Sequence, residues 1–305
     1  MGKVAFVFPG QGAQQPGMGQ HLYQTNPASK ALMDTLESLR PGLLDLCFHG
    51  TAEDLAETRN TQPCLFACEL AAAAALQDAG ISPDLVAGFS LGEVAALCFS
   101  GALSLSDGFA LVSRRGELMQ ADAERADTAM AAVVKLDTKT VEDLCAQFSQ
   151  VYPVNFNCPG QITIACLREQ LEPFSAAVKA AGGRALPLKV RGGFHSVFMS
   201  EAARQFGALL ENYSFAAPSI PIYSNYTGEP YGEDICTLLA RQIENPVRWE
   251  TIVRNLLADG VDTFFEVGPG NVLSGLIRKI DATARCFCIG TGEDVSTAVK
   301  EFRSC

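Results

Sequence analysis

Histidine and tryptophan are scarce in this sequence, which has three histidines and one tryptophan among 305 residues. Its eleven cysteines are numerous, but the pairs Cys64/Cys68 and Cys286/Cys288 do not combine into the spacing of a metal-ligand set. Most of the cysteines stand inside apolar runs, which is typical of buried thiols in a reducing compartment. We therefore expect no bound metal and no disulfide framework.

Long apolar runs and basic residues are also in short supply. No stretch of about 18 uncharged apolar residues occurs, as a membrane-spanning helix would need, and Val4–Phe8 is too short for the core of a signal peptide. Asp and Glu number 34 against 23 Lys and Arg, which gives a formal net charge of −11. A field of that sign repels nucleic acid and anionic lipid. The sequence therefore predicts a cytoplasmic protein that binds neither membrane nor nucleic acid.

The order of apolar runs predicts an α/β protein in two parts. Buried-type strands such as Leu85–Phe89 alternate with helices through residues 1–126 and 191–305, which favours a mostly parallel sheet covered by helices on both faces. Residues 127–190 instead follow the order βαββαβ, as in a ferredoxin-like module. We expect a discontinuous catalytic core, 1–126 and 191–305, with the small subdomain of residues 127–190 inserted in it.

A candidate nucleophile stands in the segment Gly88-Phe89-Ser90-Leu91-Gly92, which fits the pattern Gly-x-Ser-x-Gly. An apolar strand precedes it and an alanine-rich helix follows, and this strand-to-helix context exposes the serine oxygen at the end of a sheet. The alternative is a structural Gly/Ser turn. The context favours the nucleophile.

A serine needs a base to accept its proton. Among the three histidines, His21 and His49 stand in segments that indicate surface positions, whereas His195 precedes a predicted helix where its side chain can reach the end of the sheet. No Asp or Glu between Ser90 and His195 stands at the end of a core strand. We therefore expect a dyad in which a backbone carbonyl orients His195, although a lone histidine is often structural.

An arginine stands on an apolar helical stripe. Residues three and four positions from Arg115 are apolar, whereas those around Arg114 include Glu117 and suit a solvated face. A buried guanidinium is costly unless an anion or several carbonyls meet it. Arg115 is therefore either half of a structural ion pair or a clamp for a substrate carboxylate, for which its planar fork is well shaped.

Seven motifs occur in one order along the chain. They are Gly10-Gln11-Gly12, Gly88-Phe89-Ser90-Leu91-Gly92-Glu93, Arg115-Gly116 with Met119-Gln120, Asn157-Cys158-Pro159-Gly160-Gln161, Gly193-Phe194-His195-Ser196, Asn245-Pro246-Val247-Arg248-Trp249 and Glu266-Val267-Gly268-Pro269-Gly270. Together they resemble a known family, the malonyl-CoA:acyl-carrier-protein transacylases of fatty acid synthesis, and they are also similar to the acyltransferase domains of polyketide synthases. The resemblance covers nearly the whole chain.

The resemblance implies an α/β-hydrolase-like core with a ferredoxin-like insertion, and a mechanism. Ser90 would attack the thioester of malonyl-CoA with His195 as general base, and backbone N–H groups of Gln11 and Leu91 would form the oxyanion hole. Arg115 would pair with the malonyl carboxylate. The malonyl group would then pass to the phosphopantetheine thiol of acyl carrier protein, and no tightly bound cofactor is implied.

The resemblance implies two further roles and shows two departures. The carbonyl that orients the histidine would come from Asn245–Trp249, with Arg248 as the candidate, and Asn157 would line the cleft between the domains. The family usually has histidine where this chain has Phe89, which puts the shape of the acyl pocket in doubt. It often has glutamine where Arg248 stands, which is tolerable if only the carbonyl is used.

Three other functions compete with malonyl transfer. They are a serine thioesterase or acyl hydrolase of the same fold, a catalytically silent carrier-binding module, and a transferase for another acyl group. Arg115 discriminates against a hydrolase of neutral acyl groups, which has no use for a buried cation. An acidic carrier protein would need a local basic surface on this acidic chain, and the candidates are Arg184, Lys189, Arg191, Arg278 and Lys279.

Overall fold

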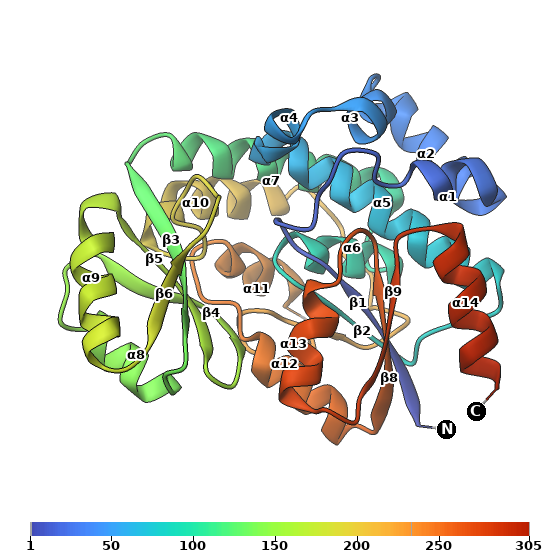
Figure 1. Cartoon of the computed structure of the whole chain (residues 1–305). Coiled ribbons are helices and arrows are strands. Elements are labelled where there is room, and N and C mark those ends of the chain that lie inside the picture. The colour runs from blue at the N-terminus through green and yellow to red at the C-terminus, as the bar shows by residue number, and fades with distance from the viewer. Residues whose placement is uncertain (1, 233, 305) are drawn as a thin grey trace.

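The computed structural model describes residues 2–232 and 234–304 and shows two sheets side by side (Figure 1). The larger sheet is parallel throughout, with the strand order β7-β2-β1-β8-β9. The α/β class and the parallel sheet are thus as predicted. The strands are β1 (Lys3–Phe8), β2 (Leu85–Gly88), β7 (Ile222–Tyr223), β8 (Val261–Val267) and β9 (Arg285–Ile289).

Both faces of the central strand β1 are buried, which explains its unbroken apolar sequence. Successive side chains of a strand point to opposite faces. Phe6 and Phe8 belong to one core with helices α5, α6 and α14, whereas Ala5 and Val7 belong to a second core with α12 and α13. The sheet is therefore the middle layer of a three-layer sandwich.

Local signals in the sequence mark the ends of several helices of this part. Glu57 is extended and separates the helix Ala52–Ala56 from the helix Thr58–Asp78. Asn26 caps the helix Pro27–Leu39, and Pro27 occupies its first position, which is typical of a helix start. The helices are α1 (Gln20–Thr25), α2 (Pro27–Leu39), α3 (Leu43–His49), α4 (Ala52–Ala56), α5 (Thr58–Asp78), α6 (Leu91–Phe99), α7 (Leu105–Ala123), α10 (Ser200–Leu210), α11 (Ile235–Gln242), α12 (Trp249–Ala258), α13 (Val272–Ile280) and α14 (Gly292–Arg303), with a short 3-10 turn at Val197–Met199.

The second sheet is antiparallel and lies at the left of Figure 1. Its strands run in the order β4-β5-β3-β6, and α8 and α9 pack against it around a core of its own. The elements are β3 (Thr128–Val134), α8 (Thr138–Cys145), β4 (Val151–Cys158), β5 (Gln161–Leu167), α9 (Arg168–Ala180) and β6 (Arg184–Pro187).

Strand β4 joins the two parts. Phe156 N–H donates to the Val247 carbonyl, and Val247 N–H donates to the Val154 carbonyl, each over 2.9 Å. α12 and α13 also pack against β4. The antiparallel sheet is therefore held at a fixed place beside the carboxyl ends of the parallel strands, where the site lies.

Candidate active site

Ser90 occupies a strained turn between β2 and α6. Its backbone is left-handed, with φ 55° and ψ −107°, a conformation that persists only where the surroundings enforce it. A Cβ on Gly88 would lie 2.0 Å from the carbonyl carbon of Gly92, and a Cβ on Gly92 would lie 2.2 Å from the Phe8 oxygen. Only glycine fits at these two positions, so this packing forces the turn that presents Ser90 at the end of the sheet.

Asn225, a residue from another part of the chain, stabilises the turn at Ser90 by hydrogen bonds to its backbone. Its Oδ1 accepts from Ser90 N–H over 2.6 Å, and its Nδ2 donates to the Gly88 carbonyl over 2.6 Å. Asn225 is fully buried, just after the edge strand β7. The sequence analysis missed it, because no local pattern links a residue 135 positions away to the nucleophile.

His195 meets Ser90 directly. The distance between His195 Nε2 and Ser90 Oγ is 2.8 Å, and His195 Nδ1 lies 2.8 Å from the Gln242 carbonyl oxygen. With Nδ1–H donating to that carbonyl, Nε2 is free to accept the serine proton. The structure thus brings together the predicted serine and histidine.

The prediction that the Arg248 carbonyl orients His195 is wrong. That carbonyl accepts from Ile252 N–H over 3.0 Å in the first turn of α12. Gln242 is the last residue of α11, where a helix leaves its carbonyls without an intrahelical partner and carries partial negative charge. A helix C-terminus supplies the orienting oxygen, and the backbone of Asn245 adds a second hydrogen bond to the ring.

The surroundings of His195 keep its imidazole neutral. Burial, and then the charge of Arg115, lower the pKa of His195 to about 4, while the two backbone hydrogen bonds oppose the shift. An imidazole with this pKa is neutral at pH 7 and can accept a proton from Ser90.

Arg115 lies on α7 and is fully buried beside the nucleophile. Its Nη1 donates to Gln62 Oε1 over 2.9 Å, and its Nη2 donates to Gln242 Oε1 over 2.7 Å and to Ser90 Oγ over 3.1 Å. Burial lowers the pKa of Arg115 to about 10, so the group remains a cation at pH 7. Of the two interpretations left open by the sequence, Arg115 forms no direct ion pair with the described residues, because its hydrogen-bond acceptors among them are neutral oxygens.

The Glu93 carboxylate links several residues around the site by hydrogen bonds. Its carboxylate accepts from Asn225 N–H over 3.1 Å, from Gln242 Nε2 over 2.7 Å and from the Tyr231 hydroxyl. Burial raises the pKa of Glu93 to about 7, against these hydrogen bonds and the charge of Arg115. Glu93 fixes the Gln242 side chain, which in turn holds Arg115. The sequence analysis quoted Glu93 only as part of a motif and missed Gln62 and Gln242.

Gln11 and Leu91 line the same small chamber as Ser90 and His195. The backbone N–H of each has no hydrogen-bond partner within residues 2–232 and 234–304. Leu91 begins α6, whose N-terminal N–H groups carry partial positive charge. Two unpaired donors beside a serine are the arrangement that stabilises an oxyanion.

Two chambers that share lining residues lie near the nucleophile, and Ser90 lines one of them. The one at the serine has a volume of about 70 Å³, space for a few atoms at ~30 Å³ per water. The second, of about 190 Å³, lies between the Gly-rich loop after β1, strands β4 and β5, and α13. Asn157 lines this second chamber, where its Nδ2 donates to Thr163 Oγ1 over 3.1 Å. Asn157 thus lies between the two parts but not at the serine.

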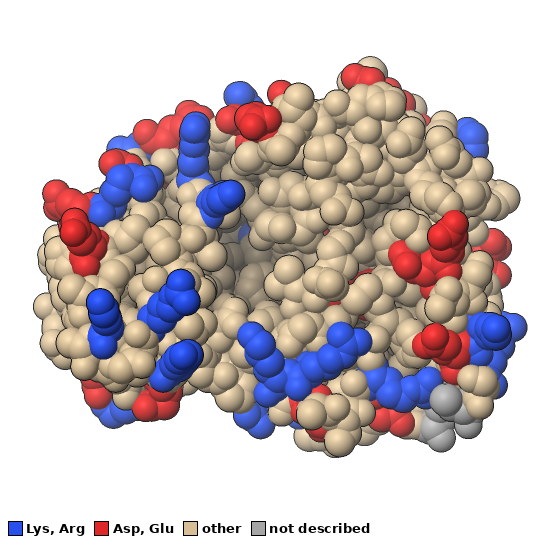
Figure 2. Space-filling view, viewed as in Figure 1, with Lys and Arg blue, Asp and Glu red and all other residues tan. Residues whose placement is uncertain are grey.

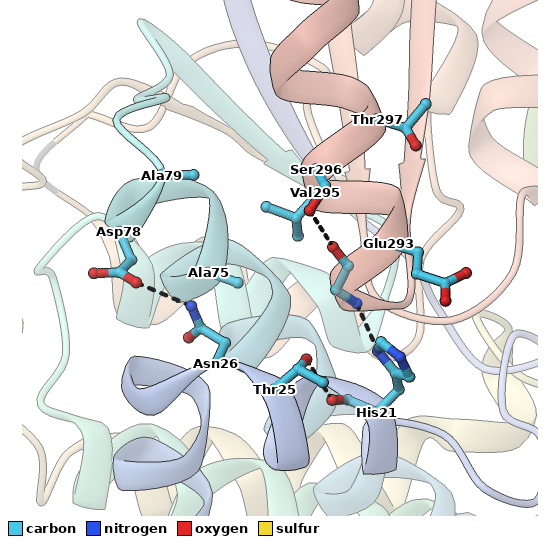
Figure 3. Close-up of a pocket in the computed structure, with 11 residues that line it drawn as sticks. His21, Thr25, Asn26, Ala75, Asp78, Ala79, Glu293, Val295, Ser296 and Thr297 are labelled. Carbon is cyan, nitrogen blue, oxygen red and sulfur yellow. Dashed lines mark hydrogen bonds between the residues drawn. The ribbon is translucent and has the colours of Figure 1, made fainter.

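A larger hollow of about 570 Å³ lies elsewhere, among α1, α5 and α14 (Figure 3). Several of its polar side chains hold the fold: His21 Nδ1 accepts from Gly292 N–H over 3.0 Å, and Asn26 donates to Asp78 over 3.0 Å. This hollow is the larger one, but Ser90 and His195 line the smaller chamber.

Lysine and arginine side chains surround the hollow between the two parts on the face shown in Figure 2. Lys279 Nζ donates to Gln161 Oε1 over 3.0 Å and so stands beside the second chamber, which Gln161 lines. All five predicted docking cations are exposed: Arg184, Lys189, Arg191, Arg278 and Lys279.

The remaining expectations concern metals, membranes and thiols. Within the part of the chain that the structure describes, no group of three or more His, Cys, Asp or Glu side chains is placed to hold a metal ion. No helix there has the length and apolar character to cross a membrane. The ten described cysteines are all free and none is exposed.

A serine on a tight strand-to-helix turn, a neutral histidine on its oxygen and two free N–H groups define a class: α/β proteins built for acyl transfer through a nucleophilic serine. A family model, described as the acyl transferase domain, matches residues 5–299. The chain belongs to this acyl transferase family.

Relatives with known names span the whole chain. The malonyl CoA-acyl carrier protein transacylase of Bacillus subtilis is 38% identical, covering 99% of this chain and 98% of the relative, and that of Escherichia coli K12 is 37% identical, covering 98% and 100%. The solved structure of the Clostridium perfringens transacylase superposes with a TM-score of 0.95 at 32% identity, covering 99% and 98%. A malonyl-transacylase solved in complex with a type II polyketide synthase acyl-carrier protein superposes with a TM-score of 0.94 at 36% identity, covering 98% and 99%.

Proposed function

We propose that this protein transfers a malonyl group from malonyl-CoA to the phosphopantetheine thiol of an acyl carrier protein, through a malonyl ester on Ser90. The observation that carries the proposal is the buried cation Arg115, 3.1 Å from the nucleophile's oxygen. A short acyl group that ends in a carboxylate can be bonded to Ser90 at one end and paired with Arg115 at the other. The names of the relatives support the same activity.

The first half-reaction loads the enzyme. His195 Nε2 takes the Ser90 proton as Oγ attacks the thioester carbonyl, and the Gln242 carbonyl stabilises the imidazolium that forms. The N–H groups of Gln11 and Leu91 hold the developing oxyanion. When the intermediate collapses, His195 returns its proton to the departing CoA sulfur. The second half-reaction reverses these roles with the carrier's thiol.

Arg115 selects the substrate in this proposal. In the free enzyme its Nη2 donates to Ser90 Oγ; a malonyl carboxylate would replace this weak acceptor with a charged one and leave the serine oxygen to react. Burying a guanidinium costs desolvation free energy, and a hydrolase of neutral acyl groups would gain no substrate-binding energy from it. The site therefore favours malonyl transfer over the thioesterase alternative.

The inserted unit is, in our proposal, a ferredoxin-like subdomain spanning residues 127–190 on an α/β-hydrolase-like core of residues 1–126 and 191–305. The element order βαββαβ and the strand order β4-β5-β3-β6 support it. Asn157 and Thr163 would contact the pantetheine arm in the second chamber. The free cysteines support a reducing, cytoplasmic location, and the proposed chemistry assigns no role to a resident cofactor.

Docking of an acidic carrier is the second part of the proposal. The five exposed cations named above would attract it to a chain whose net charge is −11. Exposed charges are screened by salt within about 10 Å at 0.1 M. Transfer to the carrier should therefore weaken as ionic strength rises, while loading from malonyl-CoA is less affected.

The test is to mix the protein with malonyl-CoA and a carrier protein bearing its pantetheine arm, and to measure malonyl-carrier and free malonate separately. The proposal predicts malonyl-carrier as the main product, none with Ser90→Ala, and none with a carrier that lacks the arm. Free malonate as the main product would favour the hydrolase instead.

A further inference from the structure

Four side chains line both the chamber at Ser90 and the larger chamber beside it, and so form a collar between the two. They are Gln11, Phe89, Asn155 and Leu188. Gln11 and Asn155 are polar, and Leu188 is 38% exposed. Phe89, which precedes the nucleophile directly, is the partly buried apolar member of the collar.

The Phe89 ring is fixed in place. It packs against the fully buried indole of Trp249, with ring centroids 5.6 Å apart, tilted by 60°. On its other side a Cβ at Gly10 would lie 2.9 Å from Phe89 Cδ1, so the Gly-rich loop closes onto the ring. Two elements therefore hold Phe89 against the nucleophile turn.

Phe89 and Trp249 together make an apolar wall. Trp249 is fully buried in the core on one face of the parallel sheet, and Phe89 packs against the same core. A phenyl ring offers a water molecule no hydrogen bond, so Phe89 presents an apolar surface to the chamber at Ser90.

The chemistry of the site makes this surface important. The neutral His195 accepts a proton from a thiol or from water alike. In hydrolysis a water oxygen attacks the ester carbonyl, its proton goes to His195 Nε2, the bond from carbonyl carbon to Ser90 Oγ breaks, and His195 returns the proton to Oγ, giving free malonate. In transfer a thiol sulfur takes the place of the water oxygen. Because His195 can accept the proton of either acceptor, the loss of the ester to hydrolysis depends on how readily water reaches it.

We propose that Phe89 shields the malonyl ester on Ser90 from water and thereby sets how that ester divides between the thiol acceptor and hydrolysis. The inference rests on the proposed function. Arg115 determines which acyl group is loaded, and Phe89 protects the ester after loading. Substitutions of the two residues should therefore change different rates, the loading rate and the hydrolysis rate.

The experiment loads the enzyme with labelled malonyl-CoA, desalts it rapidly, and follows release of free malonate in buffer without carrier. Replacing Phe89 by Leu, Val and Ala opens the wall in steps. We expect the hydrolysis rate to rise in that order, to about tenfold in Phe89→Ala, because each step admits more water to the ester. The malonyl occupancy measured directly after desalting gives the starting amount of ester for each variant, and each release rate is normalised to it.

Leu188→Ala is the matched control, because Leu188 belongs to the same collar at a place that solvent already reaches. Leu188→Ala should change the hydrolysis rate less than twofold, far less than Phe89→Ala does, if Phe89 is the residue that keeps water from the ester. A flat Phe89 series, or equal acceleration by Leu188→Ala, would overturn the inference. Thermal melting identifies any variant that fails to fold, and the remaining members still decide the trend. If the native protein is not malonylated at all, the proposed function fails instead, so the two failures are distinguishable.

Discussion

Replacing Arg115 by Ala should change which acyl group the enzyme accepts. The guanidinium is fully buried, with Nη2 donating to Ser90 Oγ and Nη1 donating to Gln62 Oε1. A hydrogen bond to a charged group contributes about 1.5–3 kcal/mol, and a buried charge left without its partner costs about 3–5 kcal/mol. Taking about 4 kcal/mol for the lost clamp, at ~1.4 kcal/mol per tenfold, kcat/KM for malonyl loading should fall about a thousandfold.

Acetyl loading should respond differently, because an acetyl group carries no charge for Arg115 to meet. We expect its rate to stay equal or to rise, so the ratio of malonyl to acetyl loading falls by about the same thousandfold. Loading of each labelled thioester is measured by rapid quench and counting of protein-bound label. The matched control is Arg114→Ala, whose guanidinium is exposed and pairs with Glu117 at 2.7 Å; it should leave both rates unchanged.

The refuting result is an equal loss of malonyl and acetyl loading in Arg115→Ala while Arg114→Ala is silent. That outcome would mean that Arg115 supports the site only as structure. Loss of the guanidinium also leaves Gln62 Oε1 and Gln242 Oε1 without their donor, at about 1–3 kcal/mol each. The melting temperature must therefore be measured beside the rates.

Three further predictions concern the dyad and the turn. Because the pKa of His195 is about 4, the imidazole is neutral above that pH and is lost as a base only below it. The loading rate, measured against pH, should therefore drop to half its plateau near pH 4. A midpoint near 6.5 would contradict the burial argument. Asn225→Ala removes the partners of Ser90 N–H and the Gly88 carbonyl, and urea unfolding should show a loss of about 2–6 kcal/mol; a loss below about 1 kcal/mol would contradict this supporting role. Gly88→Ala places a Cβ 2.0 Å from Gly92, so we expect no stable folded protein in solubility and circular dichroism assays, and a native-like spectrum would refute the packing argument.

Local sequence patterns were sufficient to pick out the three side chains that meet in the structure, Ser90, His195 and Arg115. The turn around Ser90 is dictated by glycines within two positions of it, and Arg115 could be placed by the apolar stripe of its own helix. These two signals each lie within a few neighbouring residues. His195 followed instead from elimination among the three histidines of the chain.

The residues that support the site could not be found in this way. Asn225, Gln242 and Glu93 converge from different elements, with partners 132 to 152 positions apart. The error at Arg248 has a similar origin: a carbonyl in the right segment was chosen without knowing that α12 begins there and uses it.

The measurement that tests the central claim most directly is identification of the acylated residue. The protein is mixed with malonyl-CoA for a fraction of a second, quenched in acid, digested and analysed by mass spectrometry. The account predicts one malonyl group on the peptide that carries Ser90, absent from Ser90→Ala and scarce in Arg115→Ala. A malonyl group on any other residue, a cysteine included, or no adduct at all, would contradict it.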